Sequence, residues 1–242
     1  MEQAQKEERR TRLHDWISLG ATAAALLAIA ALFAGRFAIA GIAVALAAAG
    51  ALQARRSSRS QPAPMPYAMR WVLYLPRWPL TAARLQAILQ PRPGERALEL
   101  GPGVGIYALP IAAALTPGGR LDAIDIQPEM LADLERRAAA ADVRNIVAIP
   151  GDAQRLTYPD AAFDAAYLIG VLGEIPDPGV ALRELRRVLK PGGRLVIGEV
   201  LIFDPDAVRL PTLERLAERA GFVFERRLGP RLAYFARFRP RA

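Results

Sequence analysis

Hydrophobic and polar positions alternate along the last two thirds of the chain in a way that predicts strands and helices in turn. The expected strands are Arg96 to Leu100, Arg120 to Ile126, Asn145 to Pro150, Phe163 to Ile169, Arg194 to Val200, Phe222 to Arg227 and Leu232 to Phe238. The expected helices between and after them are about Ile106 to Leu115, Pro128 to Ala140, Pro178 to Leu189 and Pro211 to Ala220. This alternation indicates an α/β fold with a seven-stranded, mostly parallel sheet. The last two strands surround Gly229-Pro230 as a hairpin, so the final strand is expected to be antiparallel to a neighbour.

The first quarter of the chain has a different pattern. Residues 1–15 are polar and mixed in charge, whereas residues 16–54 contain one charged side chain, Arg36. A single helix over this apolar span would be about 57 Å long, roughly twice the ~30 Å hydrocarbon layer. The pattern therefore predicts a transmembrane hairpin of two helices, Trp16 to Ala34 and Phe37 to Ala54. A soluble Ala-rich hairpin is the alternative, because Ala is only weakly apolar and is also the best helix former.

Basic residues flank the apolar span on both sides. They are Lys6, Arg9, Arg10 and Arg12 before it and Arg55, Arg56 and Arg59 after it. The positive-inside rule therefore places both ends of the hairpin in the cytoplasm. The predicted location is the cell membrane, with two spans and a cytoplasmic domain that follows them.

Residues 55–90 are expected to connect the hairpin to the domain formed by residues 91–242. Arg55 to Pro66 is polar and then proline-rich, which is typical of a semi-extended linker that does not pack. Tyr67 to Pro79 combines four Tyr and Trp side chains with Arg70 and Arg77, a mixture that suits the lipid headgroup layer. Packing against the following domain is the alternative, and the two do not exclude each other. Thr81 to Gln90 reads as a short amphipathic helix.

The composition restricts the possible catalytic and binding groups more than it restricts the possible folds. Lys and Arg number 32 against 24 Asp and Glu, and the net charge of +8 favours anionic surroundings such as phospholipid headgroups or nucleic acid. There is no Cys, which excludes disulfides, thiolate catalysis and most zinc sites, and no metal site is expected. The single His is His14, so the domain from Pro91 onward must work without imidazole.

A glycine-rich turn follows the first predicted strand of the domain. Gly101, Gly103 and Gly105 allow close backbone approach and direct free N–H groups toward a ligand. Such a turn alone is weakly specific, because dinucleotide enzymes use a similar one. Two details add to it: Glu99 stands two residues before the turn, and Asp125 closes the next strand, where an acid can bind ribose hydroxyls.

Taken together, these residues resemble the class I S-adenosylmethionine-dependent methyltransferases, which have a Rossmann-like fold. The resemblance covers roughly Pro91 to Pro240. The matching motifs are Glu99-Leu-Gly-Pro-Gly-Val-Gly105, Asp125, Gly151-Asp152-Ala153, Phe163-Asp164-Ala-Ala-Tyr-Leu-Ile169 and Leu189-Lys-Pro-Gly-Gly-Arg-Leu195. Their order and spacing make the resemblance highly specific, and it implies S-adenosylmethionine as the cofactor.

The resemblance also implies roles for individual residues. Glu99 and the glycine turn would seat the methionine end, and Asp125 would hold the ribose. Asp152 would contact the adenine amino group. The implied cofactor-binding residues are Glu99, Gly101, Pro102, Gly103, Gly105, Asp125, Ile126, Gly151, Asp152, Ala153 and Ile169, with Ile126 and Ala153 flanking the adenine. Capping or strand-end hydrogen bonding is the alternative for Glu99, and it is the preferred interpretation for Asp164.

The segment that would meet the methyl acceptor departs from the family. Many relatives carry His after the fourth strand, whereas Val171-Leu-Gly-Glu-Ile-Pro-Asp177 has Gly173 and Glu174 instead. Removal of a proton from the acceptor would then require a carboxylate, a Tyr or water. Glu174 and Tyr107 are the candidate catalytic residues. The alternatives are a salt bridge to one of the many Arg for Glu174 and packing at the start of the first helix for Tyr107.

Several functions fit this combination. The leading hypothesis is a membrane-anchored methyltransferase that acts on a membrane lipid, such as the amine of an ethanolamine phospholipid, with the bilayer as its partner. Ring methylation of a quinone precursor and a non-catalytic, membrane-tethered S-adenosylmethionine-binding module are the alternatives. No nucleic-acid partner is expected, because the Arg residues are dispersed with only some excess near the C-terminus. The Gly151-Asp152-Ala153 segment and the final hairpin argue against a NAD-dependent dehydrogenase.

Overall fold

The computed structural model describes residues 41–42, 44–46, 49–50, 62–75, 78–202, 204 and 206–241. The chain divides into two compact units, residues 1–62 and residues 63–242. In the first unit, residues 41–42, 44–46 and 49–50 are helical. Within the described residues, no helix combines the length and the apolar character needed to span a membrane. The predicted hairpin, Trp16 to Ala34 and Phe37 to Ala54, falls almost entirely outside these residues and stays a prediction.

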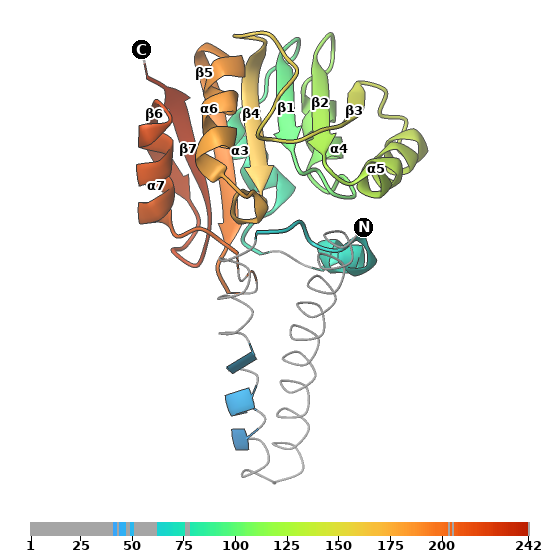
Figure 1. Ribbon diagram of the computed structural model, residues 1–242. Coiled ribbons are helices and arrows are strands. Elements are labelled where there is room, and N and C mark those ends of the chain that lie inside the picture. Colours follow the sequence, from blue (N-terminus) through green and yellow to red (C-terminus); the bar gives the residue numbers. More distant parts are fainter. Residues whose placement is uncertain are drawn as a thin grey trace, which may run out of the picture. The chain divides into compact units, whose positions relative to one another are not determined.

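The second unit is built on one seven-stranded sheet. Its strands are β1 (Arg96–Leu100), β2 (Arg120–Asp125), β3 (Ile146–Pro150), β4 (Phe163–Ile169), β5 (Leu189–Val200), β6 (Phe222–Leu228) and β7 (Ala233–Pro240). They lie in the order β3-β2-β1-β4-β5-β7-β6 (Figure 1). The first five are parallel, whereas β7 is antiparallel to both β5 and β6. The predicted Rossmann-like α/β fold with its antiparallel terminal strand is therefore confirmed.

The strand order reverses between β1 and β4. The chain leads outward from β1 through β2 to β3 and then crosses back to β4 on the other side of β1. Ligands of open parallel sheets bind at the carboxyl ends of the strands beside such a reversal. The topology therefore places the glycine turn, which follows β1, next to the segment that follows β4.

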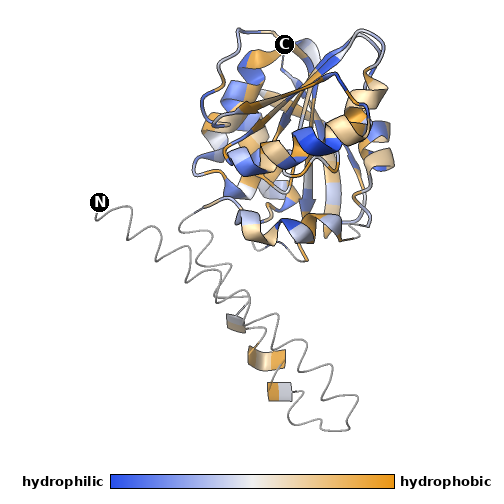
Figure 2. Cartoon of the chain, turned by 90° about the vertical axis from the view of Figure 1, so that its right-hand side faces the viewer, coloured by the Kyte–Doolittle hydropathy of each residue, from blue (hydrophilic) through white to orange (hydrophobic). Residues whose placement is uncertain are grey.

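Helices cover both faces of the sheet. The elements of the second unit that are not strands are η1 (Tyr67–Tyr74), α3 (Ala82–Leu89), α4 (Ala108–Ala114), α5 (Pro128–Ala140), η2 (Leu172–Glu174), α6 (Pro178–Val188) and α7 (Leu210–Arg219), where η marks a 3-10 helix. Side chains of α3, α4 and α5 share one apolar cluster with the sheet, and those of α6 and α7 share the other. Figure 2 shows both hydrophobic and hydrophilic residues along these helices.

The sequence explains most of these elements locally. In β4, every residue except Asp164 is buried, as expected for a strand covered on both faces. In α6, the buried positions Ala181, Leu182, Leu185 and Val188 recur at helical spacing. The helix begins at Pro178, and its N-cap residue Asp177 accepts a hydrogen bond from the Val180 N–H at 3.0 Å.

Most boundaries of the strands and helices lie within two residues of the prediction, and two of the differences have a clear structural reason. The helix after the glycine turn begins at Ala108 instead of Ile106, because residues 103–107 are still part of the turn. The fifth strand begins at Leu189 instead of Arg194, because Leu189 pairs with Phe163 across an irregularity in the register. The second difference depends on a contact between distant parts of the chain, which a local sequence pattern does not contain.

A buried ion pair ties three elements together at the amino end of the sheet. Arg194 in β5 is 7 % exposed, and its guanidinium group binds both carboxylate oxygens of Glu95, with 2.9 Å between Nη1 and Oε1. Its Nε donates to the Leu89 carbonyl at the end of α3 at 2.9 Å. The pair therefore joins α3, the start of β1 and β5.

Replacing Arg194 by Met should lower the free energy of unfolding by about 3 kcal/mol, because Glu95 and the Leu89 carbonyl lose their partner in a buried setting. Urea denaturation followed by circular dichroism measures the change. The matched control is Arg239→Met, which removes an exposed guanidinium group 3.8 Å from Glu225 and should cost well under about 1 kcal/mol. Equal losses in both variants would contradict the structural role of Arg194.

Candidate functional site

The glycine turn lies at the carboxyl end of β1, between that strand and α4. Gly101, Gly103 and Gly105 have φ of +64°, +53° and +82°, a region that side chains rarely adopt. A methyl group at Gly101 would meet the Val171 side chain, and one at Gly105 would meet Leu134. The turn is therefore restricted to glycine by its backbone conformation and by its neighbours.

Asp125 fixes the turn from the end of β2. Its Oδ2 accepts a hydrogen bond from the Gly103 N–H at 3.3 Å, and its Oδ1 accepts one from the Gln127 N–H at 2.9 Å. The residue is buried, and burial raises the pKa of its carboxyl group, while these backbone hydrogen bonds lower it. Asp125 therefore holds the ends of β1 and β2 together. Its predicted contact with a ribose stays a prediction.

Glu99 lies beneath the turn in the core. It is 2 % exposed, and its Oε2 accepts a hydrogen bond from the Tyr167 hydroxyl at 2.8 Å. Tyr167 is its register partner on the neighbouring strand β4. Burial raises the pKa of Glu99 to about 8, with the Tyr167 hydrogen bond opposing this effect. The carboxyl group is therefore mostly protonated at neutral pH, and the hydrogen bond matches the strand-end alternative for Glu99.

The other predicted cofactor residues gather at the same end of the sheet. Ile126 is 59 % exposed just after β2, and Gly151 donates its N–H to the Asp125 carbonyl at 3.0 Å. Asp152 is exposed, and its Oδ1 accepts from the Gln154 N–H at 2.8 Å. The remaining members are buried or partly buried: Pro102, Ala153 and Ile169. The structure thus brings together residues from the ends of β1, β2, β3 and β4.

Asp164 lies at the opposite, amino end of the sheet. Its Oδ2 accepts from the Arg96 N–H at 3.0 Å, and its Oδ1 pairs with Lys190 Nζ at 2.7 Å. Burial favours a higher pKa for Asp164, but the Lys190 and Arg96 hydrogen bonds outweigh it, and the pKa is below its ordinary value. The preferred structural interpretation of Asp164 is confirmed.

The two candidate catalytic residues have different surroundings. Tyr107 is 5 % exposed, and its hydroxyl donates to the Leu80 carbonyl at 2.7 Å, which agrees with the packing alternative more than with contact to an acceptor. Glu174 ends η2 and is partly exposed. Within the part of the chain that the structure describes, none of the ion pairs involves Glu174. The salt-bridge alternative for Glu174 is therefore not seen there.

Electrostatic surroundings make Glu174 unusual. Burial raises its pKa well above the ordinary value, and the nearby Asp204 and Asp206 carboxylates raise it further, while a hydrogen bond from the Met65 backbone opposes them. A raised carboxyl pKa is the direction of change that general acid–base catalysis by Glu requires.

The segment before the domain contributes contacts to the site that were not predicted from the sequence. The Met65 carbonyl accepts from Gln127 Nε2 at 2.9 Å, so the expectation that residues 55–66 do not pack is wrong at Met65. In η1, Tyr67 donates its hydroxyl to Asp133 at 3.0 Å, and a methyl group added to Gly103 would lie 2.8 Å from Leu73. Packing of Tyr67 to Pro79 on the following domain was one of the two interpretations of the sequence. The sequence did not indicate that this segment would contact the glycine turn and α5.

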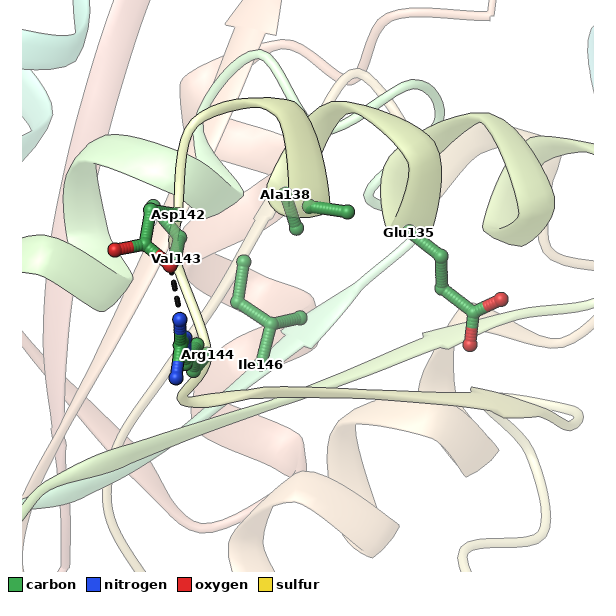
Figure 3. A pocket seen from close by; sticks show the side chains of 7 residues that line it. Glu135, Ala138, Asp142, Val143, Arg144 and Ile146 are labelled. Atoms are coloured by element: carbon green, nitrogen blue, oxygen red, sulfur yellow. Dashed lines mark hydrogen bonds and ion pairs between the residues drawn. The ribbon is translucent and has the colours of Figure 1, made fainter.

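Two hollows mark the surface of this unit. A hollow of ≈ 420 Å³ lies between the end of α5 and the start of β3, beside the Arg144–Asp142 ion pair of 2.8 Å (Figure 3). It is at the amino end of the sheet and touches none of the predicted site residues. A smaller hollow of ≈ 210 Å³ adjoins the glycine turn. Its lining residues are Leu73, Tyr74, Leu75, Leu80, Thr81, Ala82, Ile106 and Tyr107.

Comparisons with known proteins agree with this geometry. Residues 98–197 match a family described as "Methyltransferase domain". The chain is 35% identical over 136 residues to 27-O-demethylrifamycin SV methyltransferase of Amycolatopsis mediterranei, covering 56% of this chain and 49% of that protein. It is also 35% identical over 103 residues to demethylmenaquinone methyltransferase of Geobacillus kaustophilus, covering 43% and 44%. The chain thus spans less than half the length of these curated relatives.

Solved structures support the fold. A SAM-dependent methyltransferase from Aquifex aeolicus superposes with a TM-score of 0.67 at 20% identity, covering 73% of this chain and 98% of that one. The cyclase SpnF superposes with a TM-score of 0.60 at 20% identity, covering 66% and 80%. A shared fold therefore leaves the reaction open.

Residues 98–197 thus match a methyltransferase domain, and this match implies S-adenosylmethionine as the cofactor, as predicted. The residues fit this ligand. The turn leaves no room for a side chain at Gly101, and the end of β2 presents an exposed apolar side chain, Ile126, beside an acid, Asp125. Such a pair suits an adenine face and ribose hydroxyls.

The raised pKa of Glu99 predicts a pH-dependent stability. Between the ordinary value of 4.5 and about 8, the folded protein keeps a proton that the unfolded chain releases, so stability falls as pH rises through this interval. Glu99→Gln removes the titrating group and should shrink the loss of melting temperature between about pH 5 and about pH 8. The exposed control Glu135→Gln should leave that loss unchanged. An unchanged loss in Glu99→Gln would contradict the assignment.

Gly103→Ala should weaken S-adenosylmethionine binding about tenfold or more, because the new methyl group is strained at φ +53° and crowds Leu73. Isothermal titration calorimetry gives the dissociation constant. Gly94→Ala is the matched control: its φ is +83°, but nothing lies within 4 Å of the added group. Equal affinity losses in the two variants would mean that backbone strain alone, and not the glycine turn, accounts for the effect.

Proposed function

We propose that this chain, whose residues 98–197 form a methyltransferase domain, is an S-adenosylmethionine-dependent methyltransferase that works at a membrane and methylates a lipid acceptor. The observation that carries the proposal is that an exposed apolar surface and the predicted cofactor site lie at the same end of the sheet. The acceptor proposed first is the amine of an ethanolamine phospholipid.

The exposed surface, called here the apolar end surface, consists of two groups. Its members are Trp71, Tyr74, Leu75, Trp78, Ile202 and Leu232, each more than half exposed. The first four belong to η1 and the segment after it, and Leu73 of η1 contacts the glycine turn. Ile202 and Leu232 follow β5 and precede β7, next to the hydrogen bond of 2.8 Å from the Leu201 N–H to the Leu232 carbonyl. Both groups therefore belong to the carboxyl end of β1 and β5 (Figure 1).

Exposed Trp and Tyr beside basic side chains are typical of proteins that meet lipid headgroups. Arg70 lies among these aromatic residues, with 41% of its side chain exposed. The apolar residues 16–54 provide a second means of attachment, as the proposed two-span anchor with the methyltransferase domain in the cytoplasm. The ≈ 210 Å³ hollow beside the glycine turn, lined largely by apolar side chains, would accept part of a lipid chain.

At the site, the chain's own residues have two tasks. The glycine turn, Asp125 and Ile126 would hold S-adenosylmethionine, which supplies a methyl group on a sulfonium when bound. Glu174 is the proposed acceptor of the proton that an amine must lose. Alignment of the two substrates provides most of the acceleration in such a transfer. An amine requires only deprotonation and alignment, which suits a domain without His.

A quinone precursor is the second candidate. It is favoured by the similarity to demethylmenaquinone methyltransferases, at 35% identity over less than half of this chain. A quinone precursor is also lipophilic, so the apolar end surface fits both acceptors. A tethered S-adenosylmethionine-binding module without turnover is the remaining alternative.

The test incubates the purified full chain with methyl-labelled S-adenosylmethionine and vesicles that contain phosphatidylethanolamine, or with demethylmenaquinone in the same vesicles. The proposal expects label in the organic phase with phosphatidylethanolamine, as products heavier by whole methylene units. Label on the quinone alone would favour the second candidate. Label confined to protein or RNA, or tight cofactor binding without transfer to any lipid, would reject the proposal.

A further inference from the structure

We infer that Glu199, together with Glu174, Asp204 and Asp206, forms a subsite that binds the positively charged nitrogen of the methyl acceptor. The inference rests on the proposed function and deepens it, because it assigns the charge class of the acceptor and residues that would recognise it. Glu199 is the central member, and nothing in the sequence analysis singled it out.

Glu199 is a fully buried carboxyl group with one oxygen left over. It lies on β5 with 0 % exposure, and its Oε2 accepts from the Val208 N–H at 3.2 Å. Its Oε1 is buried and has no hydrogen-bond partner among the described residues. Leaving a buried acceptor unsatisfied costs roughly 1 to 3 kcal/mol, and more for a charged group. An unsatisfied oxygen of this kind beside a candidate active site is expected where a ligand supplies the missing donor.

Backbone contacts place the acidic group next to the cofactor turn. The Gly170 N–H donates to the Gly198 carbonyl, one residue before Glu199, at 2.8 Å. A methyl group added to Gly170 would lie 3.7 Å from Asp204 Oδ2, and one added to Gly173 would clash with the Asp206 carbonyl oxygen. Gly170 and Gly173 therefore lie directly against Asp204 and Asp206.

The same segment touches the cofactor turn on its other side. The side chain of Val171 fills the space beside Gly101, and Glu174 follows three residues later. The acidic group thus lies across one short segment from the glycine turn.

The charges of the group favour a cation. The carboxylates of Asp204, Glu174 and Asp206 all act on Glu199, and burial together with these neighbours raises the pKa of Glu199 well above its ordinary value. Among the described residues, no ion pair involves Glu199 or Glu174. A protonated amine would supply N–H donors to Glu199 Oε1 and stabilise the ionised carboxylates around it.

Other ligands fit the group less well. Among the described residues, no group of three or more His, Cys, Asp or Glu side chains is arranged to hold a metal ion. An anionic or phenolate acceptor would be repelled by several nearby carboxyl groups. The subsite therefore separates an amine acceptor from a quinone precursor, which the apolar end surface cannot do.

Binding of two short-chain lipids tests the inference. The probes are dihexanoyl phosphatidylethanolamine and dihexanoyl phosphatidylglycerol, titrated calorimetrically into the full chain in the presence of S-adenosylhomocysteine, which prevents turnover. The ethanolamine lipid should bind about tenfold more tightly or better than the glycerol lipid. Glu199→Gln should abolish most of this preference, while the affinity for S-adenosylhomocysteine stays the same. Glu218→Gln, an exposed change in α7, is the matched control and should leave the preference intact.

Equal binding of the two lipids to the unchanged chain, or an unchanged preference in Glu199→Gln, would overturn the inference. If Glu199→Gln does not fold, Asp204→Asn on the neighbouring loop is titrated instead, with the same expected loss of preference and the same contrary outcome. The proposed function can fail separately from the subsite. In that case the chain would still prefer the ethanolamine lipid, and Glu199→Gln would still remove the preference, but no label would be transferred to any lipid. Conversely, the chain could transfer label to the quinone and show no preference between the two lipid headgroups. That result would overturn the subsite but would still support a methyltransferase that acts on a lipophilic acceptor.

Discussion

The hydrogen bond from the Gly103 N–H to the Asp125 carboxylate joins the ends of the first two strands, and the arrangement of the site depends on it. This hydrogen bond holds the glycine turn, whose positive φ angles suit glycine. Leu73 and Val171 pack on the surface of that turn. Because the strand order reverses beside this turn, the segments after β4 and β5 converge on it as well. The conformation of the turn and the reversal of the strand order together place the cofactor and acceptor regions side by side.

The carboxyl groups at the two ends of the sheet have different surroundings. At the amino end, Glu95 and Asp164 are paired with Arg194 and Lys190, and those contacts hold strands and helices together. At the carboxyl end, Glu99, Asp125, Glu174 and Glu199 are buried or partly buried, and each has a raised pKa. None of these four carboxyl groups forms an ion pair within the described part of the chain, and burying a carboxyl group without a compensating cation opposes folding. Carboxyl groups with raised pKa values that gather at one end of the sheet therefore indicate a functional region.

Much of the sheet could be predicted from the sequence, because buried parallel strands are continuous apolar runs between Gly and Pro residues. The position of the glycine turn and of the residues that follow the strand ends could also be predicted, whereas their contacts with the cofactor stay a prediction. The start of β5 at Leu189 was not predictable, because it depends on pairing with Phe163. The contact of Leu73 with the glycine turn could not be predicted either, nor could the approach of Asp204 and Asp206 to Glu174. Both contacts join segments that are distant in sequence.

Hydrogen–deuterium exchange of the full chain with and without S-adenosylmethionine tests most directly whether the glycine turn is the cofactor site. The account predicts that the cofactor slows amide exchange in residues 101–107, 125–127 and 151–154, and that Gly103→Ala removes this protection. Protection confined to residues 135–146, around the larger hollow at the amino end of the sheet, would contradict it.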